Sequence, residues 1–346
     1  MRIALPSQRG TTQWLLLLVF TVLLLTVPSW AGDYWTRIFT GVAMWSALAM
    51  SWNIIGGYAG YISFGQSAFF GIGAYTTALL MQQGRDWNFF ATLPVGALIA
   101  AVVAVIVGWP VLRLRGAYFA IATWAMAEAF LQLATAAGFT GGSFGLSTPI
   151  NSSTSFFYYV MLVGAMATFG VSYWLLERSR FGYRVKAVRD HEVAAESVGI
   201  DTTRVKIQAF ALSALIPGVF GGIYAYWITF INPPSVLAGD ITDQMVVMAL
   251  VGGLGRIAGP ALGATLLFLV NRQFLAWFGD TTAYIAVVGA LVALVVLFLP
   301  DGLVSLFSHG PRMALVRQLV ARAVPDAATR WVPRGKDSGS KDKERL

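Results

Sequence analysis

Long runs of apolar residues, separated by short stretches of charged residues, glycine and proline, make up most of this sequence. A helix needs about 20 mainly apolar residues to cross the hydrocarbon core of a bilayer, which is about 30 Å thick. The runs that approach this length are 13–30, 36–55, 62–83, 89–111, 117–137, 156–176, 207–231, 241–255, 259–279 and 282–300. The pattern therefore predicts an all-α, polytopic membrane protein with about ten transmembrane helices.

The run at 241–255 is too short to cross a bilayer without thinning of the bilayer. Its end is rich in glycine and leads into Gly259-Pro260, and both residue types interrupt helices. A broken or re-entrant helix near 241–260 is therefore an alternative to a full crossing.

Basic residues fall mainly on one side of the predicted spans. Cytoplasmic loops close to membrane spans retain lysine and arginine, and an inside N-terminus leaves only Arg37, Arg85 and Arg272 on the outer side. We therefore expect both termini in the cytoplasm. The expected organisation is a cytoplasmic N-terminus (1–12), a transmembrane domain (13–300) with a cytoplasmic loop at 177–206, and a basic cytoplasmic tail (301–346) whose end is disordered.

A cleaved signal peptide is the alternative for the first run. Arg2 and Arg9 precede it, and Ser29-Trp30-Ala31 loosely resembles a cleavage site. Cleavage would leave an odd number of spans and place the mature N-terminus outside.

The composition agrees with a membrane protein, since 57% of the residues are hydrophobic and 12% are charged. The net charge of +8 suits loops and a tail that lie against the anionic lipids of the inner leaflet, so membrane lipid is an expected partner. Aromatic residues are not interleaved with the charges, so nucleic-acid binding is not expected. The chain has no cysteine, and His191 and His309 lie outside the apolar runs, so no metal site is expected.

Glu128 is a carboxylate near the middle of an apolar run, 117–137. An ionised side chain at that depth costs roughly 2.5 to 3.5 kcal/mol, so it normally faces a partner or a water-filled path. In a transport path it would attract a cationic group of a solute. The alternative is a structural role, as a buried residue bonded to a neighbouring serine, tryptophan or tyrosine.

Two glycine-rich segments are candidates for lining a path. The first contains Ser63, Gly65 and Ser67, where small residues permit either close helix packing or an unwound element in the path. The second is the outer loop 139–155, with three glycines that allow positive φ values and close backbone approach to a partner or solute. Its three glycines are Gly141, Gly142 and Gly145.

The inside loop 177–206 is the longest polar interruption of the membrane pattern. Its middle, 185–198, places valine and alanine among charges and predicts one short amphipathic helix that ends at Gly199. Asp201 or Thr202 is suited to cap the next helix. Small alanines on this helix would let a groove of another protein approach closely, and an ordinary interfacial helix is the alternative.

This loop resembles the coupling loop of permeases in ATP-binding cassette (ABC) importers, in which Glu-Ala-Ala is followed, after three further residues, by glycine. Here Val193-Ala194-Ala195 and Gly199 fit that spacing, and the glutamate stands one residue early, at Glu192. From about residue 40 to 300 the chain is also similar to the LivM-type permease of branched-chain amino acid importers. The similar segments include WNIIGGYAGYISFGQSAFFGIGAYTTALL (52–80), LRLRGAYFAIATWAMAE (112–128), FTGGSFGLS (139–147), RVKIQAFALSALIPGVFGGIYA (204–225) and MVVMALVGGLGRIAGPALGA (245–264).

The resemblance implies a permease subunit of the inner membrane that moves branched-chain or related amino acids into the cytoplasm. It also implies a related sister permease, two cytoplasmic ATPase subunits and a periplasmic solute-binding protein. Residues 192–195 and Gly199 would then contact an ATPase subunit, and no cofactor would bind this chain itself.

The sequence contains no G-x-x-x-x-G-K-[ST] or H-E-x-x-H motif, so we expect neither an ATPase site nor another catalytic site. ATP would be bound by the partner subunits. Three alternatives stay open: a permease for urea or short amides, an ATP-independent channel or secondary transporter, and an integral membrane enzyme. The long inside loop argues against a channel, and the lack of a polar catalytic cluster argues against an enzyme.

Overall fold

The computed structural model describes residues 24–82 and 87–279, together with 289–290, 293 and 302–304. The chain divides into two units, 1–304 and 305–346. The second unit, which contains most of the predicted cytoplasmic tail, lies outside the described residues. So do the N-terminus predicted at 1–12, most of the predicted span at 13–30 and most of that at 282–300.

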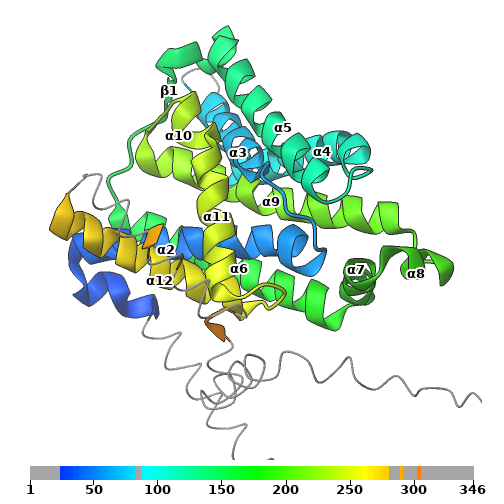
Figure 1. The fold of residues 1–346 in the computed structure, drawn as a ribbon. Coiled ribbons are helices and arrows are strands. Elements are labelled where there is room, and N and C mark those ends of the chain that lie inside the picture. Colours follow the sequence, from blue (N-terminus) through cyan, green and yellow to red (C-terminus); the bar gives the residue numbers. More distant parts are fainter. Residues whose placement is uncertain (1–23, 83–86, 280–288, 291–292, 294–301, 305–346) are drawn as a thin grey trace, which may run out of the picture. The chain divides into compact units, whose positions relative to one another are not determined.

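The described part of the first unit is almost entirely helical (Figure 1). Its membrane-domain helices are α2 (Gly32–Asn53), α3 (Gln66–Met81), α4 (Phe89–Val111), α5 (Ala117–Ala136), α6 (Thr154–Tyr173), α9 (Thr202–Ile228), α10 (Pro233–Leu237), α11 (Gly239–Gly252) and α12 (Ala258–Phe278). The inside loop forms α7 (Arg180–Asp190) and α8 (Glu192–Ser197). Five-residue π-helical segments, Ile54–Tyr58 and Trp174–Arg178, continue α2 and α6.

Within the described residues, six helical segments are long and apolar enough to cross a membrane. They are Gly32–Tyr58, Phe89–Val111, Ala117–Ala136, Thr154–Arg178, Thr202–Ile228 and Pro233–Gly252. The chain is therefore an all-α polytopic membrane protein, whereas the number of about ten crossings and the cytoplasmic termini stay predictions. The predicted span 62–83 forms only the shorter α3, because residues 59–65 are not helical.

The segment predicted as a short span at 241–255 starts earlier and ends earlier in the structure. Asn232 caps α10 with its side chain, Ala238 interrupts the helix with an extended conformation (ψ 147°), and α11 ends at Gly252. Together α10 and α11 cover 20 residues, which removes the reason to consider the segment too short. In Figure 1, α11 lies across α2, and the glycine-rich stretch that follows it connects it to α12.

The core of the bundle is built on close contacts between small residues. α9 packs most extensively against α3 and α4, and the three helices meet at Gly73, Gly96 and Gly218. A Cβ atom at Gly73 would collide with the carbonyl oxygen of Gly218, and one at Gly96 would lie 3.3 Å from the Cα of Gly73. Glycine lets helix backbones in a membrane approach this closely.

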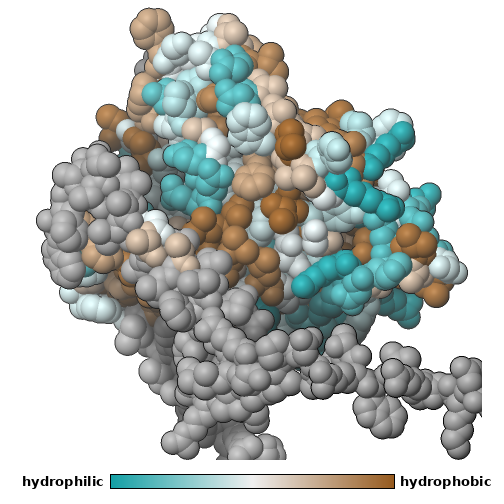
Figure 2. Space-filling model, viewed as in Figure 1, coloured by the Kyte–Doolittle hydropathy of each residue, from teal (hydrophilic) through white to brown (hydrophobic). Residues whose placement is uncertain are grey.

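Helices α4, α5 and α6 cover the core but bury little of their own surface. Only 22% of the apolar window of α5 is buried, against 83% for the segment that contains α2. Figure 2 shows hydrophobic residues at the surface in the middle of the molecule and hydrophilic residues around them, including the end that carries α7 and α8. The exposed apolar faces are therefore suited to lipid or to another membrane subunit.

Candidate functional site

The inside loop folds as two helices, so the prediction of a single helix over 185–198 is wrong. His191 adopts an extended conformation (φ −160°, ψ 99°) that ends α7, and its Nδ1 accepts a hydrogen bond from the N–H of Ala194 at 3.3 Å to cap α8. Because polar residues flank this break on both sides, the hydropathy pattern carries no signal for it. In Figure 1, α7 and α8 lie at the opposite end of α9 from α10.

An exposed apolar patch marks α8, which we call the α8 surface and define as Val193, Ala194, Val198 and Gly199. Val193 is 57% exposed and Val198 is 77% exposed. Figure 2 shows hydrophobic residues surrounded by hydrophilic ones at the place of α8. Ala195, which we expected on the same exposed face, is instead only 3% exposed and packs into the core of this chain.

The loop turns sharply after α8 and enters α9. Gly199 has a φ of +84°, a conformation that L side chains rarely adopt, and it ends α8 as predicted. The Asp201 side chain accepts a hydrogen bond from the N–H of Arg204 at 3.0 Å and caps α9, also as predicted. The hydroxyl of Thr202 donates to Glu196 at 2.7 Å and ties the two helices together.

Glu192, the first residue of α8, points into the protein and not toward a docking partner. Its carboxylate lies 2.6 Å from the Nζ of Lys206 on α9 and 3.3 Å from the Nε of Arg115, which precedes α5. The hydroxyl of Tyr61 donates to it at 3.1 Å. The side chain of Lys206 is 6% exposed, so this is a buried ion pair that connects α8 to three other segments.

A second group repeats the same combination of residue types one helix away. The hydroxyl of Tyr58 donates to Glu177 at 2.6 Å, and Lys186 on α7 pairs with Glu177 at 2.7 Å. Each lysine also lies 5.4 Å from the ring centre of its tyrosine, within the range of a cation–π contact. We refer to these as the Tyr58–Glu177–Lys186 and Tyr61–Glu192–Lys206 groups.

Both tyrosines belong to the glycine-rich segment between α2 and α3, and Arg189 of α7 contacts the same region. A Cβ atom at Gly60 would lie 3.2 Å from the Cγ of Arg189, and one at Gly255 would lie 2.6 Å from its Nη1. The loop helices are therefore fastened to the membrane domain at several points. A force applied to α8 would be transmitted directly to the non-helical segment 59–65 and to the start of α9.

The titration of Glu192 gives a testable consequence. Burial raises the pKa of Glu192, but Lys206, Tyr61 and Arg115 together lower it below the ordinary glutamate value. A carboxylate with a lowered pKa in the folded state stabilises the fold above its unfolded pKa, about 4.3, and loses that contribution as the pH falls further. We therefore expect the difference in melting temperature between wild type and Glu192→Gln to be constant near neutral pH and to shrink below about pH 4.

Scanning fluorimetry across a pH series would measure this difference in purified protein. A difference that stays unchanged down to about pH 3 would show that the charge of Glu192 contributes nothing to stability.

The predicted path residues of the first glycine-rich segment are buried. Ser63 and Ser67 are 0% exposed, and Gly65 is also buried beneath Met126 and Thr123 of α5. Trp52 donates to the carbonyl of Ser63 at 2.7 Å, and the N–H of Ser67 donates to Thr242 at 2.8 Å. Side chains thus satisfy backbone groups of the non-helical segment and of the first turn of α3, both packed inside one chain.

The glycines of the outer loop have a structural explanation. Gly141, Gly142 and Gly145 all have positive φ values. A Cβ atom at Gly145 would collide with the carbonyl oxygen of Ile231, where strand β1 (Leu146–Ser147) pairs with β2 (Phe230–Ile231) in antiparallel fashion. The tight fold of this loop leaves Phe144 89% exposed at its tip.

Glu128 lies on the outward side of α5, partly exposed, and accepts a hydrogen bond from Gln132 of the same helix at 2.7 Å. The structure does not bring it together with Ser63, Gly65 or Ser67, which lie beneath α5 in the core. A path past Glu128 would therefore run along the surface of this chain, between it and another subunit.

Sequence reasoning missed the partners of Glu192 and the whole Tyr58–Glu177–Lys186 group. Lysine residues at the ends of apolar segments and tyrosines beside glycines were visible, but their pairing requires the fold. Lys206 was the best available signal, since it is a charged residue at the start of a long apolar helix.

Comparison with known proteins agrees with this architecture. A family described as "Branched-chain amino acid transport system / permease component" matches residues 34–298. The high-affinity branched-chain amino acid transport system permease protein LivM of Escherichia coli (strain K12) is 29% identical over 336 residues, covering 87% of this chain and 78% of that protein. The LivM protein of Salmonella typhimurium (strain LT2) is 30% identical with the same coverage.

A probable branched-chain amino acid transport permease protein LivM from Methanocaldococcus jannaschii is 25% identical over 280 residues, covering 69% of this chain and 81% of that protein. No solved structure matches the chain. The family match covers α2, except its first two residues, and every later described helix through α12, together with the inside loop. The chain therefore belongs to the family of permease components of branched-chain amino acid transport systems.

Proposed function

We propose that this protein is the inner-membrane permease subunit of an ABC importer that moves branched-chain or related amino acids into the cytoplasm. ATP is hydrolysed by two cytoplasmic partner subunits, one of which docks on the α8 surface. A periplasmic binding protein delivers the solute, and a sister permease completes the path. The names of the LivM relatives support the solute class.

The exposed α8 surface, held to the membrane domain by a buried ion pair, is the observation that carries this proposal. An interfacial helix would need only to cover lipid, and a channel would need no such rigid attachment. Here the exposed valines of α8 offer an apolar contact, while Glu192 on the same helix connects to Lys206 and Tyr61. Docking on α8 would therefore move α9 and the glycine-rich segment together.

The position of Glu128 supports a sister subunit against α5. A partly exposed carboxylate in a membrane-crossing helix is costly against lipid hydrocarbon, so it is better placed against a second protein or a hydrated path. Trp124 is 56% exposed on the same helix and would contribute to that contact. In this arrangement the solute passes between two permeases, with Glu128 at the boundary.

Val198→Glu tests the docking proposal. An added carboxylate on the α8 surface would be desolvated in an interface, so we expect ATPase subunits recovered with the tagged chain to fall at least about tenfold. ATP-driven uptake of leucine should fall in parallel. The complete importer would be co-expressed, purified in mild detergent and quantified by subunit.

Phe144→Glu is the matched control, because it also introduces a carboxylate at an exposed apolar residue, in the predicted outer loop. It should leave the ATPase content unchanged. Full ATPase recovery with Val198→Glu would contradict the proposal. Solute flux by the chain alone, without ATP, would instead support a channel or secondary transporter, and competition by urea but not leucine would support the alternative solute.

A further inference from the structure

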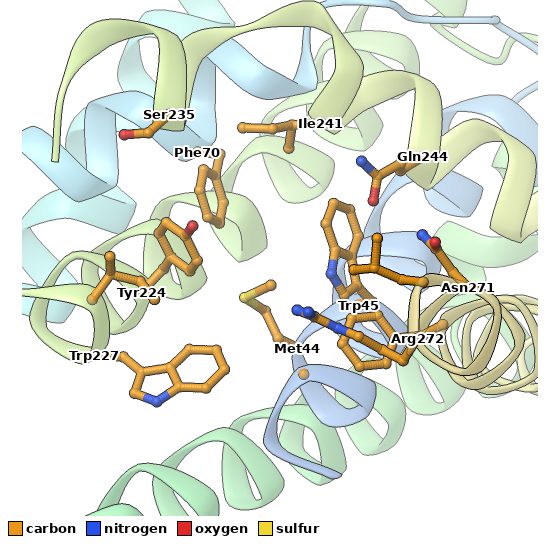
Figure 3. Close-up of a pocket in the computed structure, with 14 residues that line it drawn as sticks. Met44, Trp45, Phe70, Tyr224, Trp227, Ser235, Ile241, Gln244, Asn271 and Arg272 are labelled. Atoms are coloured by element: carbon orange, nitrogen blue, oxygen red, sulfur yellow. The ribbon is translucent and has the colours of Figure 1, made fainter. Parts of the chain in front are cut away.

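A pocket of about 300 Å³ lies among α2, α9, α11 and α12, away from both the α8 surface and Glu128. Figure 3 shows side chains from these helices and from α3 around a common space, with Ser235 of α10 at its edge. Its volume is at the lower end of the range for small-molecule sites. The pocket has a polar side and an apolar side, which together specify a ligand.

The polar side consists of Gln244 on α11 and the neighbouring residues Asn271 and Arg272 on α12. The Oδ1 atom of Asn271 is buried and receives no hydrogen bond from any residue that the structure describes. Arg272 lies 5.2 Å from the ring centre of Phe268, and no carboxylate of the described chain lies within ion-pair distance of it. Figure 3 shows its guanidinium group extending toward Met44.

The apolar side faces these groups across the pocket. Met44, Phe70 and Ile241 form it, and Tyr224 closes it beside Phe70 (Figure 3). The rings of Phe70 and Tyr224 lie 5.4 Å apart, so this wall is well packed. A branched or linear hydrocarbon group fits such a surface, whereas a second charged group does not.

The unsatisfied groups define the rest of the ligand. A guanidinium group pairs best with a planar carboxylate, which accepts two parallel hydrogen bonds. A buried carbonyl oxygen without a donor costs free energy until an N–H group reaches it. We infer that this pocket binds an α-amino acid with an apolar side chain, its carboxylate on Arg272, its ammonium group on Asn271 and its side chain against Met44, Phe70 and Ile241.

Ordered water or a phospholipid headgroup explains less of the pocket. Water would satisfy Asn271 but would leave the apolar wall facing a polar guest. A headgroup would place polar atoms against Met44 and Ile241, where an amino acid places its hydrocarbon. The inference rests on the proposed function for the solute class, but the pocket can be tested by binding alone.

The test is equilibrium binding of radiolabelled L-leucine to the complete importer in nanodiscs without nucleotide or binding protein. Arg272→Gln should weaken binding at least about tenfold, because a charge-assisted contact is lost. Arg37→Gln is the control, since Arg37 is an exposed arginine of α2 that does not line the pocket. It should bind like wild type.

Analogues of leucine test each contact. Leucinamide, which lacks the carboxylate, and 4-methylpentanoate, which lacks the ammonium group, should each compete at least about tenfold more weakly than leucine. Asn271→Leu should reduce the preference for leucine over 4-methylpentanoate. Binding of leucine to Arg272→Gln as tightly as to wild type would overturn the inference. Loss of all leucine binding in nanodiscs in which phosphatidylethanolamine replaces phosphatidylcholine would also overturn it.

ATP-driven uptake in the same preparation separates this inference from the proposed function. If wild type takes up leucine and Arg272→Gln binds and transports it equally well, the pocket is not the site but the importer assignment stands. If wild type binds leucine at the pocket yet transports none, the importer assignment fails and the pocket stands.

Discussion

Gly73→Ala should prevent most of the protein from folding, although it adds a single methyl group. The added Cβ atom would collide with the carbonyl oxygen of Gly218, which belongs to the backbone of α9 and cannot rotate away. Gly218 is itself confined, since its own Cβ position lies 2.9 Å from Ala100 on α4. Because overpacking alone costs about 1 to 3 kcal/mol and here three helix backbones must separate, we expect a loss of about 3 kcal/mol or more.

The measurement is the yield of monodisperse protein by fluorescence-detected size-exclusion chromatography, followed by its melting temperature. Gly170→Ala on α6 is the control, since nothing lies within 4 Å of its Cβ position. It should be neutral or stabilise by up to about 1 kcal/mol, the usual advantage of alanine over glycine in a helix. Equal yields from the two variants would mean that α3 and α9 are not held together at Gly73.

The membrane helices were largely predictable because residues close to each helix end determine where it starts and stops. The run 89–111 coincides with α4, whose start is capped by Asn88, and 117–137 extends only one residue beyond α5. Gly116, with a φ of +57°, explains the sharp start of α5. Apolar length and a cap or glycine at each end suffice for such helices.

The elements that were not predictable depend on contacts between distant segments. Residues 59–65 are apolar and glycine-rich like a helix in a membrane, but hydrogen bonds to distant side chains hold them unwound. Trp52 donates to the carbonyl of Ser63, and Thr123 accepts from the N–H of Phe64. The hydropathy of a segment gives no information about hydrogen bonds to distant side chains. The span 62–83 was therefore assigned too long, and the same limit hid the break at Ala238.

The position of α8 was predictable, but the orientation of its residues was not. The spacing around Ala194 located α8 and its terminal glycine, yet Glu192 and Ala195 face inward, where we expected an outward surface. The polarity of Glu128 indicated a special position in the membrane, but only the fold shows that it lies on the outside of this chain. Sequence patterns identify which residues are unusual, and the neighbours decide what they do.

Glu192→Gln should be the most damaging single change in the inside loop. It removes the negative charge beside Lys206, whose side chain is 6% exposed and whose other polar partner is the carbonyl of Leu112 at 3.3 Å. Breaking a buried ion pair from one side leaves an uncompensated charge and costs about 3 to 5 kcal/mol. We expect a corresponding fall in melting temperature, and ATP-driven uptake that falls further than ATP hydrolysis.

The double variant Glu192→Gln with Lys206→Met distinguishes two causes of the lost stability, an unpaired buried charge on Lys206 and lost packing. With the buried ammonium group gone, the double variant should be more stable than Glu192→Gln alone, a coupling that a double-mutant cycle measures directly. Glu196→Gln is the control on the same helix, because Glu196 is exposed and a glutamine can still accept the hydrogen bond from Thr202. It should change stability by no more than about 0.5 kcal/mol.

Uptake by the double variant tests whether the ion pair transmits movement or only stabilises the fold. If it regains stability but not uptake, with the ATPase subunits still bound, then the ion pair is needed to transmit movement from α8 to α9 and Tyr61. If uptake returns together with stability, Glu192 only secures the fold, and transmission must run through the other attachment, the Tyr58–Glu177–Lys186 group. Additive losses in the cycle would contradict the ion pair itself, because two groups in contact at 2.6 Å cannot be energetically independent.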